Sequence, residues 1–179
     1  MDQDVGAFVA NRFGEVHSAT PVLNYPRWCA VSDARAKPAA ALGYRVASEG
    51  PLFLEAYLDE PIEDLVSEAF GRLFGRGDIV EIGCLASTPT PALLKLWHQV
   101  AGRLRGQQEI AVATLTRPLR SMFARIGMPL VPLAKADPAR MGDIASWGRY
   151  YELDPVVCAG AIEPGAAALA AYAERSGRA

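Results

Sequence analysis

The stretch DIVEIGCLA, residues 78–86, decides the fold class of this chain of 179 residues. It is apolar at nearly every position, as expected of a strand that is covered on both faces of a sheet. Thr90 and Pro91 then supply an N-cap and a first-turn proline for a helix, and residues 109–115 form a second strand-like run. We therefore predict that residues 78–116 fold as strand, helix and strand, which is the core of a mixed α/β domain.

The same alternation continues toward the C-terminus. Residues 119–126 predict a helix that ends at Gly127, and residues 130–133 predict another strand. Successive strand–helix–strand units use right-handed crossovers, so we expect a sheet that lies between helices. The alanine-rich tail, residues 163–179, is weakly patterned and predicts a loosely held terminal helix.

The half of the chain before residue 78 has a different pattern. Residues 1–20 predict an amphipathic helix with Asp4 as a possible N-cap, and a second helix is expected to start at Pro61 and to stop at Gly75 and Gly77. Three extended segments between these helices are separated by turns and predict consecutive antiparallel strands: residues 28–31, 39–46 and 52–58. We therefore expect one domain, residues 1–179, with a mixed α/β sheet flanked by helices.

Composition excludes several classes of protein. The formal net charge is −2 and the basic residues are scattered, which is not the charge pattern of a nucleic-acid-binding protein. The longest apolar runs, such as residues 156–162, are far shorter than the roughly 18 residues needed to cross a bilayer. The acidic start of the chain is unlike a signal peptide, and three widely spaced cysteines suggest a reducing compartment, so we expect a cytoplasmic protein. His17 and His98 lie on separate predicted helices, so no metal site is expected.

Glu81 is the most informative polar residue, because it interrupts an apolar strand in which a buried charge is costly. Strand alternation places it on the face of Gly83 and Leu85, with Cys84 on the opposite face. The absent side chain at Gly83 is expected to leave space beside the carboxylate for the amine of a ligand. Desolvation would raise the pKa of Glu81 toward the range of a general base. The alternative is a structural ion pair with one of three arginines: Arg45, Arg76 or Arg120.

Two further segments are placed to contribute to a site at this end of the sheet. The turn after the strand lies where open α/β sheets bind anions, but Pro89 and Pro91 lack N–H donors, and the turn has no glycine-rich run. Ser87 and Thr88 offer hydroxyls in their place. Thr114 ends the second strand, and its hydroxyl is expected to face the same cleft. The aromatic cluster at residues 147–151 either lines a pocket or belongs to the core.

Several motifs together resemble the thermostable hemolysin family. They are ALGYR at 41–45, LFLE at 52–55, YLD at 57–59, PIE at 61–63, VEIG at 80–83, LA at 85–86, LR at 119–120, ADP at 136–138, and WG and YY at 147–148 and 150–151. The match extends from about Ala39 to Gly160. More distantly, the order of elements is similar to that of the GNAT-type N-acyltransferases and of the acyl-homoserine-lactone autoinducer synthases.

This resemblance implies a GNAT-like acyl-CoA N-acyltransferase fold and an acyl thioester co-substrate. In such folds two core strands splay apart, so that the pantetheine arm of the donor can bind the freed backbone. Here the expected donor-binding residues are Ile82, Gly83, Cys84, Leu85 and Ala86, continuing into Ser87 and Thr88, with residues 111–114 on the facing strand. The resemblance also makes Glu81 a candidate base or ligand for the acceptor amine and Thr114 a candidate catalytic residue. It makes Arg45, Glu55 and Tyr150 candidates for binding substrate.

Three departures from these families leave more than one function open. The glycine-containing pyrophosphate loop is replaced by Ser87-Thr88-Pro89-Thr90, a frequent general-acid tyrosine by Phe123, and a family asparagine by Cys84. An acyl carrier protein, whose phosphopantetheine lacks the nucleotide, is therefore an alternative donor to acyl-CoA. A non-catalytic member that binds an acyl carrier or a partner enzyme is a second hypothesis. A membrane-lytic protein, as the family name suggests, is a third, although the chain has no cationic amphipathic helix.

Overall fold

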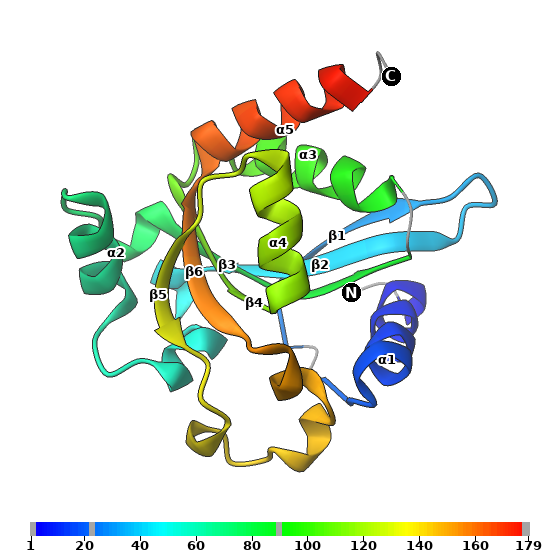
Figure 1. Ribbon diagram of the computed structural model, residues 1–179, viewed down its shortest axis with the longest axis horizontal. Coiled ribbons are helices and arrows are strands. Elements are labelled where there is room, and N and C mark those ends of the chain that lie inside the picture. The colour runs from blue at the N-terminus through cyan, green and yellow to red at the C-terminus, as the bar shows by residue number, and fades with distance from the viewer. Residues whose placement is uncertain (1–2, 22–23, 89–90, 177–179) are drawn as a thin grey trace.

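The computed structural model describes residues 3–21, 24–88 and 91–176, and it confirms a mixed α/β fold (Figure 1). One six-stranded sheet has the order β1-β2-β3-β4-β6-β5. Its strands are β1 (Arg27–Ser32), β2 (Pro38–Val46), β3 (Ile79–Ser87), β4 (Ile110–Leu115), β5 (Val131–Lys135) and β6 (Val156–Ala161). The expected strands at residues 28–31, 39–46, 78–86, 109–115 and 130–133 are therefore all present, within a few residues.

The C-terminal half of the sheet differs from the expected simple alternation. β1 and β2 pair antiparallel and β3 pairs parallel with β4, as predicted, and β2 pairs antiparallel with β3 in place of the expected strand at residues 52–58. However, β5 does not lie beside β4, because β6 inserts between them and pairs antiparallel with both. The sequence analysis predicted no strand in the apolar run at residues 156–162, which supplies β6. Its central residues Val157, Cys158 and Ala159 are at most 2% exposed, which is why this run forms a buried strand.

In the described part of the chain, five α-helices cover the two faces of the sheet. They are α1 (Gln3–His17), α2 (Ile62–Phe70), α3 (Ala92–Leu104), α4 (Arg117–Ile126) and α5 (Ile162–Ser176). One hydrophobic cluster joins β3 to α3, α4 and α5 through residues such as Ile82, Trp97 and Phe123. The opposite face is covered by α1 in one cluster and by α2 with neighbouring turns in another. Figure 1 shows α3, α4 and α5 together, with α1 and α2 at separate edges.

The predicted third strand, residues 52–58, is wrong. Residues Phe53–Tyr57 form a 3-10 helix, η2, whose Leu54 and Tyr57 side chains are buried. The apolar residues of this segment therefore pack on one side of a turn and not on alternate faces of a strand. The cause lies outside the segment, because the N–H groups that a strand would use for pairing bond to the carboxylate of Glu81.

Helix ends also correct the sequence expectations in detail. α2 stops at Gly71, which has a φ of 68°, and not at Gly75, so the later apolar residue Leu73 lies 90% exposed in the following turn. Asp4 lies within α1 and is not its N-cap, and Thr90, the predicted cap of α3, is outside the described residues. The C-terminal tail is a regular helix, α5, that is held by Leu169 and packs on α3.

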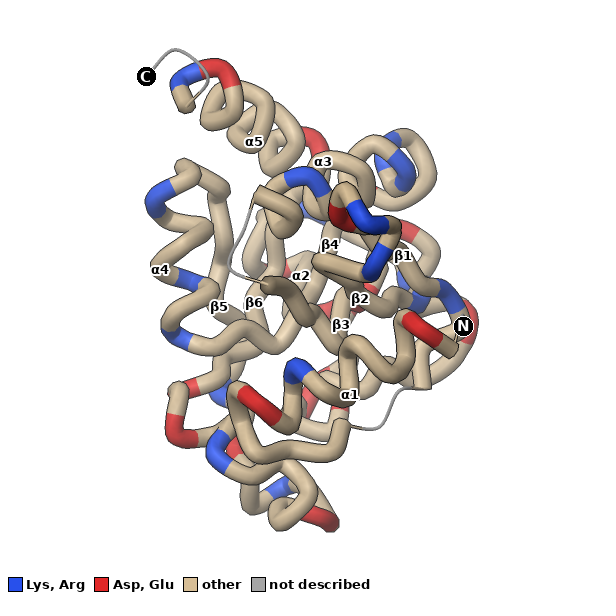
Figure 2. The backbone as a smooth tube through the Cα atoms, turned by 90° about the vertical axis from the view of Figure 1, so that its right-hand side faces the viewer, with Lys and Arg blue, Asp and Glu red and all other residues tan. Residues whose placement is uncertain are grey.

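Charged positions are interspersed along the described chain, without a continuous basic stripe in the view of Figure 2. Acidic and basic side chains also pair across elements, as Arg105 does with Glu163 and Arg140 with Asp59. Among the described residues, no helix is both long and apolar enough to cross a membrane.

Candidate active site

The parallel pairing between β3 and β4 ends early, and this opens the sheet. The last paired residues are Glu81 and Val112. Beyond them β3 continues along β2 as far as Ser87, while β4 continues along β6 as far as Leu115. The two strands therefore splay apart as the family resemblance implied, with residues 82–86 freed on β3. On β4 the freed segment begins at Ala113, because Ala111 and Val112 still pair with β3.

A bulge in β3 reverses the expected orientation of two side chains. Ala41 pairs with Ala86 and Gly43 with Gly83, so β3 has one residue more than β2 between these pairs, and Cys84 has a φ of 50°. Cys84 therefore packs in the cluster under α1, on the side of Glu81, whereas Leu85 packs in the cluster of Ile82 on the other face. The predicted faces of Cys84 and Leu85 are both wrong for this reason.

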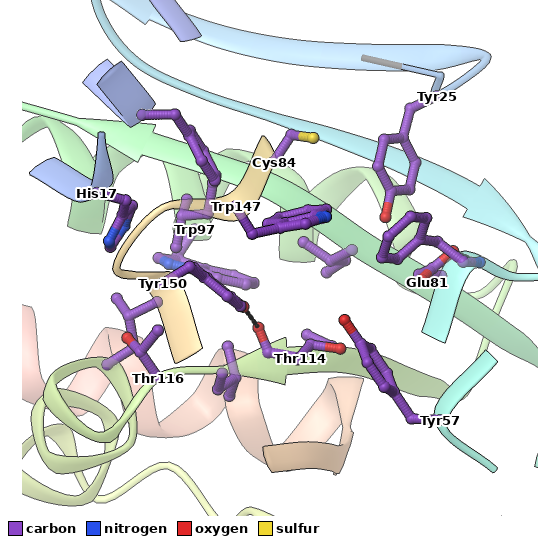
Figure 3. Close-up of a pocket in the computed structure, with 18 residues that line it drawn as sticks. His17, Tyr25, Tyr57, Glu81, Cys84, Trp97, Thr114, Thr116, Trp147 and Tyr150 are labelled. Carbon is purple, nitrogen blue, oxygen red and sulfur yellow. Dashed lines mark hydrogen bonds between the residues drawn. The ribbon is translucent and has the colours of Figure 1, made fainter. Parts of the chain in front are cut away.

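A pocket of about 90 Å³ occupies the splay. Of the candidate residues predicted from the sequence it brings together seven: Glu81, Ile82, Gly83, Cys84, Leu85, Thr114 and Tyr150. Residues that the sequence analysis did not assign to a site complete its wall, among them His17, Tyr25, Tyr57 and Trp97. Figure 3 shows Glu81, Tyr25 and Tyr57 at one end of the pocket and His17, Trp97 and Thr116 at the other.

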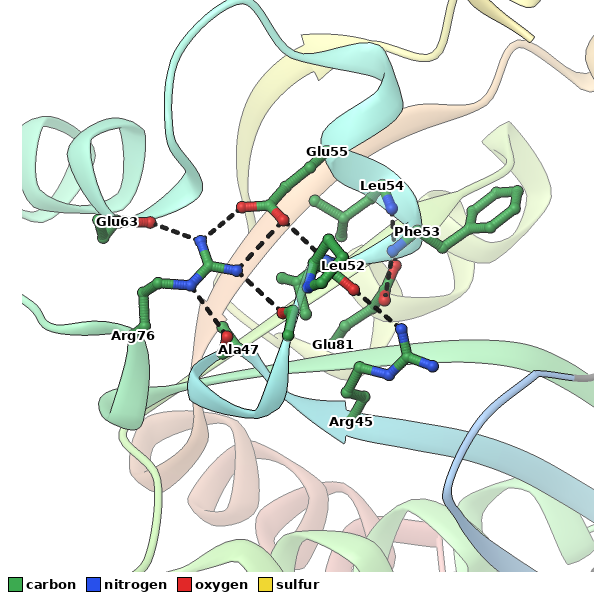
Figure 4. Close-up of polar contacts among 11 residues, drawn as sticks. Arg45, Ala47, Leu52, Phe53, Leu54, Glu55, Glu63, Arg76 and Glu81 are labelled. Atoms are coloured by element: carbon green, nitrogen blue, oxygen red, sulfur yellow. Dashed lines mark hydrogen bonds and ion pairs between the residues drawn. The ribbon is translucent and has the colours of Figure 1, made fainter. Parts of the chain in front are cut away.

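Glu81 is 2% exposed, and its carboxylate is satisfied by the backbone. Oε2 accepts the N–H of Phe53 and Oε1 accepts the N–H of Leu54, both at 2.9 Å, at the start of η2 (Figure 4). Burial raises the pKa of Glu81, as predicted, and these two hydrogen bonds oppose the rise in part. Glu81 thus holds η2 against the sheet at the point where β3 and β4 separate.

The predicted ion pair between Glu81 and an arginine is not found among the described residues. The Arg45 guanidinium donates to the carbonyls of Pro51 and Asn24, and its positive charge only assists the carboxylate of Glu81 at a distance. Arg76 binds Glu55 and Glu63, and Arg120 binds Asp154. Backbone N–H groups, which no sequence pattern identifies, take the place of the cation.

Tyr25 fills the space that the sequence analysis assigned to a ligand. A Cβ atom on Gly83 would lie 2.5 Å from Tyr25 Cζ, and one on Gly43 would lie 2.6 Å from Tyr25 Cβ. Gly43 and Gly83 face each other across β2 and β3, so the tyrosine lies over a pair of residues without side chains. Its hydroxyl points toward Glu81 (Figure 3), and burial together with the charge of that carboxylate raises the pKa of Tyr25 well above its usual value. The free space predicted beside the carboxylate is therefore occupied by a side chain of the protein itself.

Three more tyrosines surround the β4 side of the pocket. The hydroxyls of Tyr57 and Tyr151 lie 2.7 Å apart, and the Tyr150 hydroxyl donates to the Thr114 carbonyl at 3.3 Å. Burial raises the pKa of Tyr57 and Tyr150, so both remain neutral hydroxyls at physiological pH. The predicted aromatic cluster at residues 147–151 thus supplies Trp147 and Tyr150 to the pocket wall.

The other predicted site residues do not line this pocket. The Ser87 carbonyl accepts a hydrogen bond from Arg12, and both the N–H and the hydroxyl of Thr88 donate to the Ala39 carbonyl. Ala86 is buried under α1. Arg45 and Glu55 hold turns beside the pocket, and their contact with substrate stays a prediction. No cluster of three potential metal ligands occurs among the residues that the structure describes.

Tyr25 lies in the segment between α1 and β1, and Tyr57, although it belongs to the YLD motif, lies at the end of η2 and not on a strand. The paired glycines were the one available signal for Tyr25, since they indicate close approach of another group. Trp97 lies on α3 in the core cluster of Ile82, and its position on the pocket wall depends on the splay.

Comparisons with known proteins agree with this geometry. The family profile described as thermostable hemolysin matches residues 1–166. No curated protein sequence matches the chain significantly.

Three solved structures share the fold at low sequence identity. TofI in an apo form aligns with a TM-score of 0.64 and 15% identity over 93% of this chain and 86% of TofI. FeeM, an N-acyl amino acid synthase from uncultured soil microbes, aligns with a TM-score of 0.56 and 11% identity over 88% of each chain. BjaI, a CoA-dependent acyl-homoserine lactone synthase solved with SAM and isopentyl-CoA, has a TM-score of 0.54 and 14% identity over 87% of this chain and 68% of BjaI. The chain therefore has a GNAT-like fold.

Proposed function

The chain belongs to the thermostable hemolysin family, and we propose that it is an acyltransferase that moves an acyl group from a thioester to an amine. The observation that carries this proposal is the early end of β3–β4 pairing, which leaves backbone groups free beside a pocket with a buried carboxylate at its closed end. Solved structures of the same fold include an N-acyl amino acid synthase and a synthase that holds isopentyl-CoA.

The donor binds in the splay through its pantetheine arm. The N–H and C=O groups of residues 82–86 and of Ala113 that point into the splay provide the donors and acceptors that an extended, amide-containing chain needs, while the Thr114 carbonyl accepts the Tyr150 hydroxyl. Beyond Ser87, the N–H and the hydroxyl of Thr88 both donate to the Ala39 carbonyl, so they are not available to bind a phosphate. The acyl-phosphopantetheine of a carrier protein therefore fits this site, as does acyl-CoA bound mainly by its arm.

The reaction needs a group that accepts a proton from the amine. The amine nitrogen bonds to the thioester carbonyl carbon, the C–S bond breaks, and the thiol leaves with a proton. The Tyr25 hydroxyl, which lines the pocket beside Glu81, gives its proton to Glu81 as it takes one from the amine, and the same relay in reverse returns a proton to the leaving thiolate. The raised pKa of Glu81 brings this carboxylate closer to the range of a useful base.

Thiol release tests this function directly. Purified protein is offered a panel of acyl-CoAs and acyl carrier proteins together with amines, and free thiol and amide product are measured. We expect turnover that falls by about a hundredfold or more in Glu81→Gln, the usual size of a lost general base. Glu68→Gln, on the exposed side of α2, is the matched control and should retain turnover. Unchanged turnover in Glu81→Gln would remove Glu81 from the mechanism.

A non-catalytic carrier-binding protein is the second candidate, and one observation favours it. Phe123, which stands at the position of the frequent general-acid tyrosine, is 1% exposed and packs edge-to-face on Trp97 at 5.1 Å. This position therefore belongs to the core and offers no proton donor. Binding of acyl carrier protein without release of thiol from any donor and amine pair would favour this candidate over the enzyme.

A further inference from the structure

Two buried ring nitrogens in the pocket have no hydrogen-bond partner among the residues that the structure describes. They are Nδ1 of His17 and Nε1 of Trp97, and both residues line the pocket at the end away from Glu81 (Figure 3). Buried polar groups in folded proteins are nearly always satisfied, because an unpaired donor or acceptor loses its hydrogen bonds to water without replacement. Two such atoms in one pocket indicate a polar group that is bound there.

The two rings reach the pocket from opposite faces of the sheet. His17 ends α1, whereas Trp97 lies on α3 and packs in the cluster on the other face. They can approach the same space only because β3 and β4 have separated. In Figure 3 the indole nitrogen of Trp97 is on the side of the ring toward His17.

Both rings are held in place by neighbouring aromatic residues. Trp97 is 8% exposed and packs edge-to-face on Phe123 at 5.1 Å and 83°. His17 packs on Phe13 at 5.5 Å and edge-to-face on Tyr150 at 5.4 Å. The rings are therefore fixed with these nitrogens unsatisfied, and a bound group must come to them.

The chemistry of the two nitrogens is complementary. An indole N–H only donates. Burial and the charge of Arg149 lower the pKa of His17, so its imidazole is neutral near pH 7 and has one donor and one acceptor nitrogen. With the proton on Nε2, Nδ1 accepts. One donor beside one acceptor matches a secondary amide, whose C=O accepts and whose N–H donates.

We propose that Trp97 Nε1 and His17 Nδ1 bind a secondary amide of the donor's pantetheine arm, an assignment that rests on the proposed acyl-thioester function. Thr116, at the C-terminal end of β4, lines the same end of the pocket, while Glu81 marks the point where the strands part. An arm that enters from the open end of the splay passes between His17 and Trp97 before its thioester reaches Glu81. Trp97 and His17 are thus donor-binding residues that hold the arm in register.

Titration with pantetheine, followed by NMR of the three tryptophan indole N–H groups, tests this assignment. We expect the Trp97 signal, identified by its loss in Trp97→Phe, to move on binding. Trp97→Phe and His17→Phe should each weaken pantetheine binding by about five- to tenfold, the usual size of one lost hydrogen bond. The matched controls are Trp28→Phe, whose indole already donates to the Tyr25 carbonyl at 3.0 Å, and His98→Phe on the exposed side of α3. Both controls should bind as the wild type does.

A second probe separates recognition of the amide from general packing. A thiol-terminated polyether of similar length has no amide, and its affinity should not change in Trp97→Phe. The assignment is wrong if pantetheine does not bind or if the Trp97 signal stays in place. It is also wrong if Trp97→Phe lowers the affinity for pantetheine and for the polyether by the same factor. Absence of thioester turnover together with an amide-dependent Trp97 shift would instead reject the enzyme function and retain this site.

Discussion

Tyr25 and the glycine pair beneath it determine how close a substrate can come to Glu81. The ring lies over Gly43 and Gly83, and its hydroxyl points toward the carboxylate. Tyr25 and Glu81 thus line the same end of the pocket. The sequence indicated a ligand in this space because the side chain that fills it comes from another segment of the chain.

Gly83→Ala tests this packing. The new Cβ would lie 2.5 Å from Tyr25 Cζ, so the tyrosine must move, and we expect a loss of about 1–3 kcal/mol in the free energy of unfolding. Gly102→Ala on α3, where no atom lies within 4 Å, is the control and should stabilise the protein by up to about 1 kcal/mol. Urea unfolding measures both. If Gly83→Ala costs the same when Tyr25 is already alanine, Tyr25 is not the cause.

The buried carboxyl of Glu81 should make stability depend on pH in a defined direction. Its pKa is raised in the folded protein. At a pH between the unfolded and the folded pKa, the carboxyl is therefore protonated in the folded state and ionised in the unfolded chain. The contribution of this group to stability is therefore complete below the unfolded pKa and is lost as the pH rises through the folded pKa. In Glu81→Gln this dependence is absent.

The measurement is urea unfolding of both proteins at several pH values from about 4 to 8, across the expected titration. The NH₂ group of the glutamine side chain cannot accept a hydrogen bond, so the N–H of either Phe53 or Leu54 loses its acceptor. We therefore expect the wild type to be more stable by about 1–3 kcal/mol at low pH. That advantage should shrink as the pH rises. An advantage that grows with pH would mean that the folded carboxyl has a lowered pKa.

At the scale of elements, Arg76 organises the turns that carry the Glu81 contacts. It donates to Glu55 at 2.6 Å and to Glu63 at 2.9 Å, and also to the carbonyls of Ala47 and Gly50. These bonds connect the 3-10 turn η1 (Ala47–Glu49), η2 and α2 to the start of β3 (Figure 4). Glu55 in turn accepts the N–H of Leu52, directly before η2.

Arg76→Lys should therefore weaken this region. An ammonium group cannot reproduce the forked geometry of the guanidinium, so we expect a loss of about 1–3 kcal/mol in the free energy of unfolding. Faster hydrogen exchange at the Phe53 and Leu54 amides should accompany it. The control is Arg105→Lys, whose pair with Glu163 is fully exposed to solvent and should leave stability unchanged within error. Equal effects of the two substitutions would contradict the role given to Arg76.

Elements could be predicted from the sequence where their own residues determine them. The strand at 79–87, the helix ending at Gly127 and the β1–β2 pair follow from periodicity and turn residues. η2 could not be predicted, because its conformation depends on Glu81, about 27 residues away in the chain. The bulge at Cys84 could not be predicted either, because strand alternation assumes that each residue of one strand pairs with one residue of its neighbour.

At the scale of the whole molecule, the sheet splays apart between its two central strands, β3 and β4, and its strands are paired on either side of this gap. β1 and β2 support β3, while β6 and β5 support β4, so the splay lies between two paired halves. The resemblance of the core motifs predicted the fold and the splay from sequence. It could not predict which side chains from α1, η2 and α3 close the pocket, because this depends on how these elements pack against the strands.

Acyl transfer and membrane lysis make different predictions for the intact protein. On the acyltransferase account the purified chain should release no trapped dye from liposomes of phosphatidylcholine and phosphatidylglycerol at concentrations where it consumes thioesters. A detergent-treated sample sets full release, and denatured protein controls for nonspecific leakage. Dye release that Glu81→Gln leaves unchanged would support the lytic function that the family name suggests.

The occupation of the splay by the donor is the central claim, and amide hydrogen exchange tests it most directly. NMR measures each amide with and without a non-hydrolysable acyl-pantetheine analogue. Among residues 82–86 and 113–114, the amides that point into the splay should be protected when the analogue binds, while amides paired between β1 and β2 keep their rates. Saturating analogue that leaves every amide of the splay exchanging at its free rate would contradict the account.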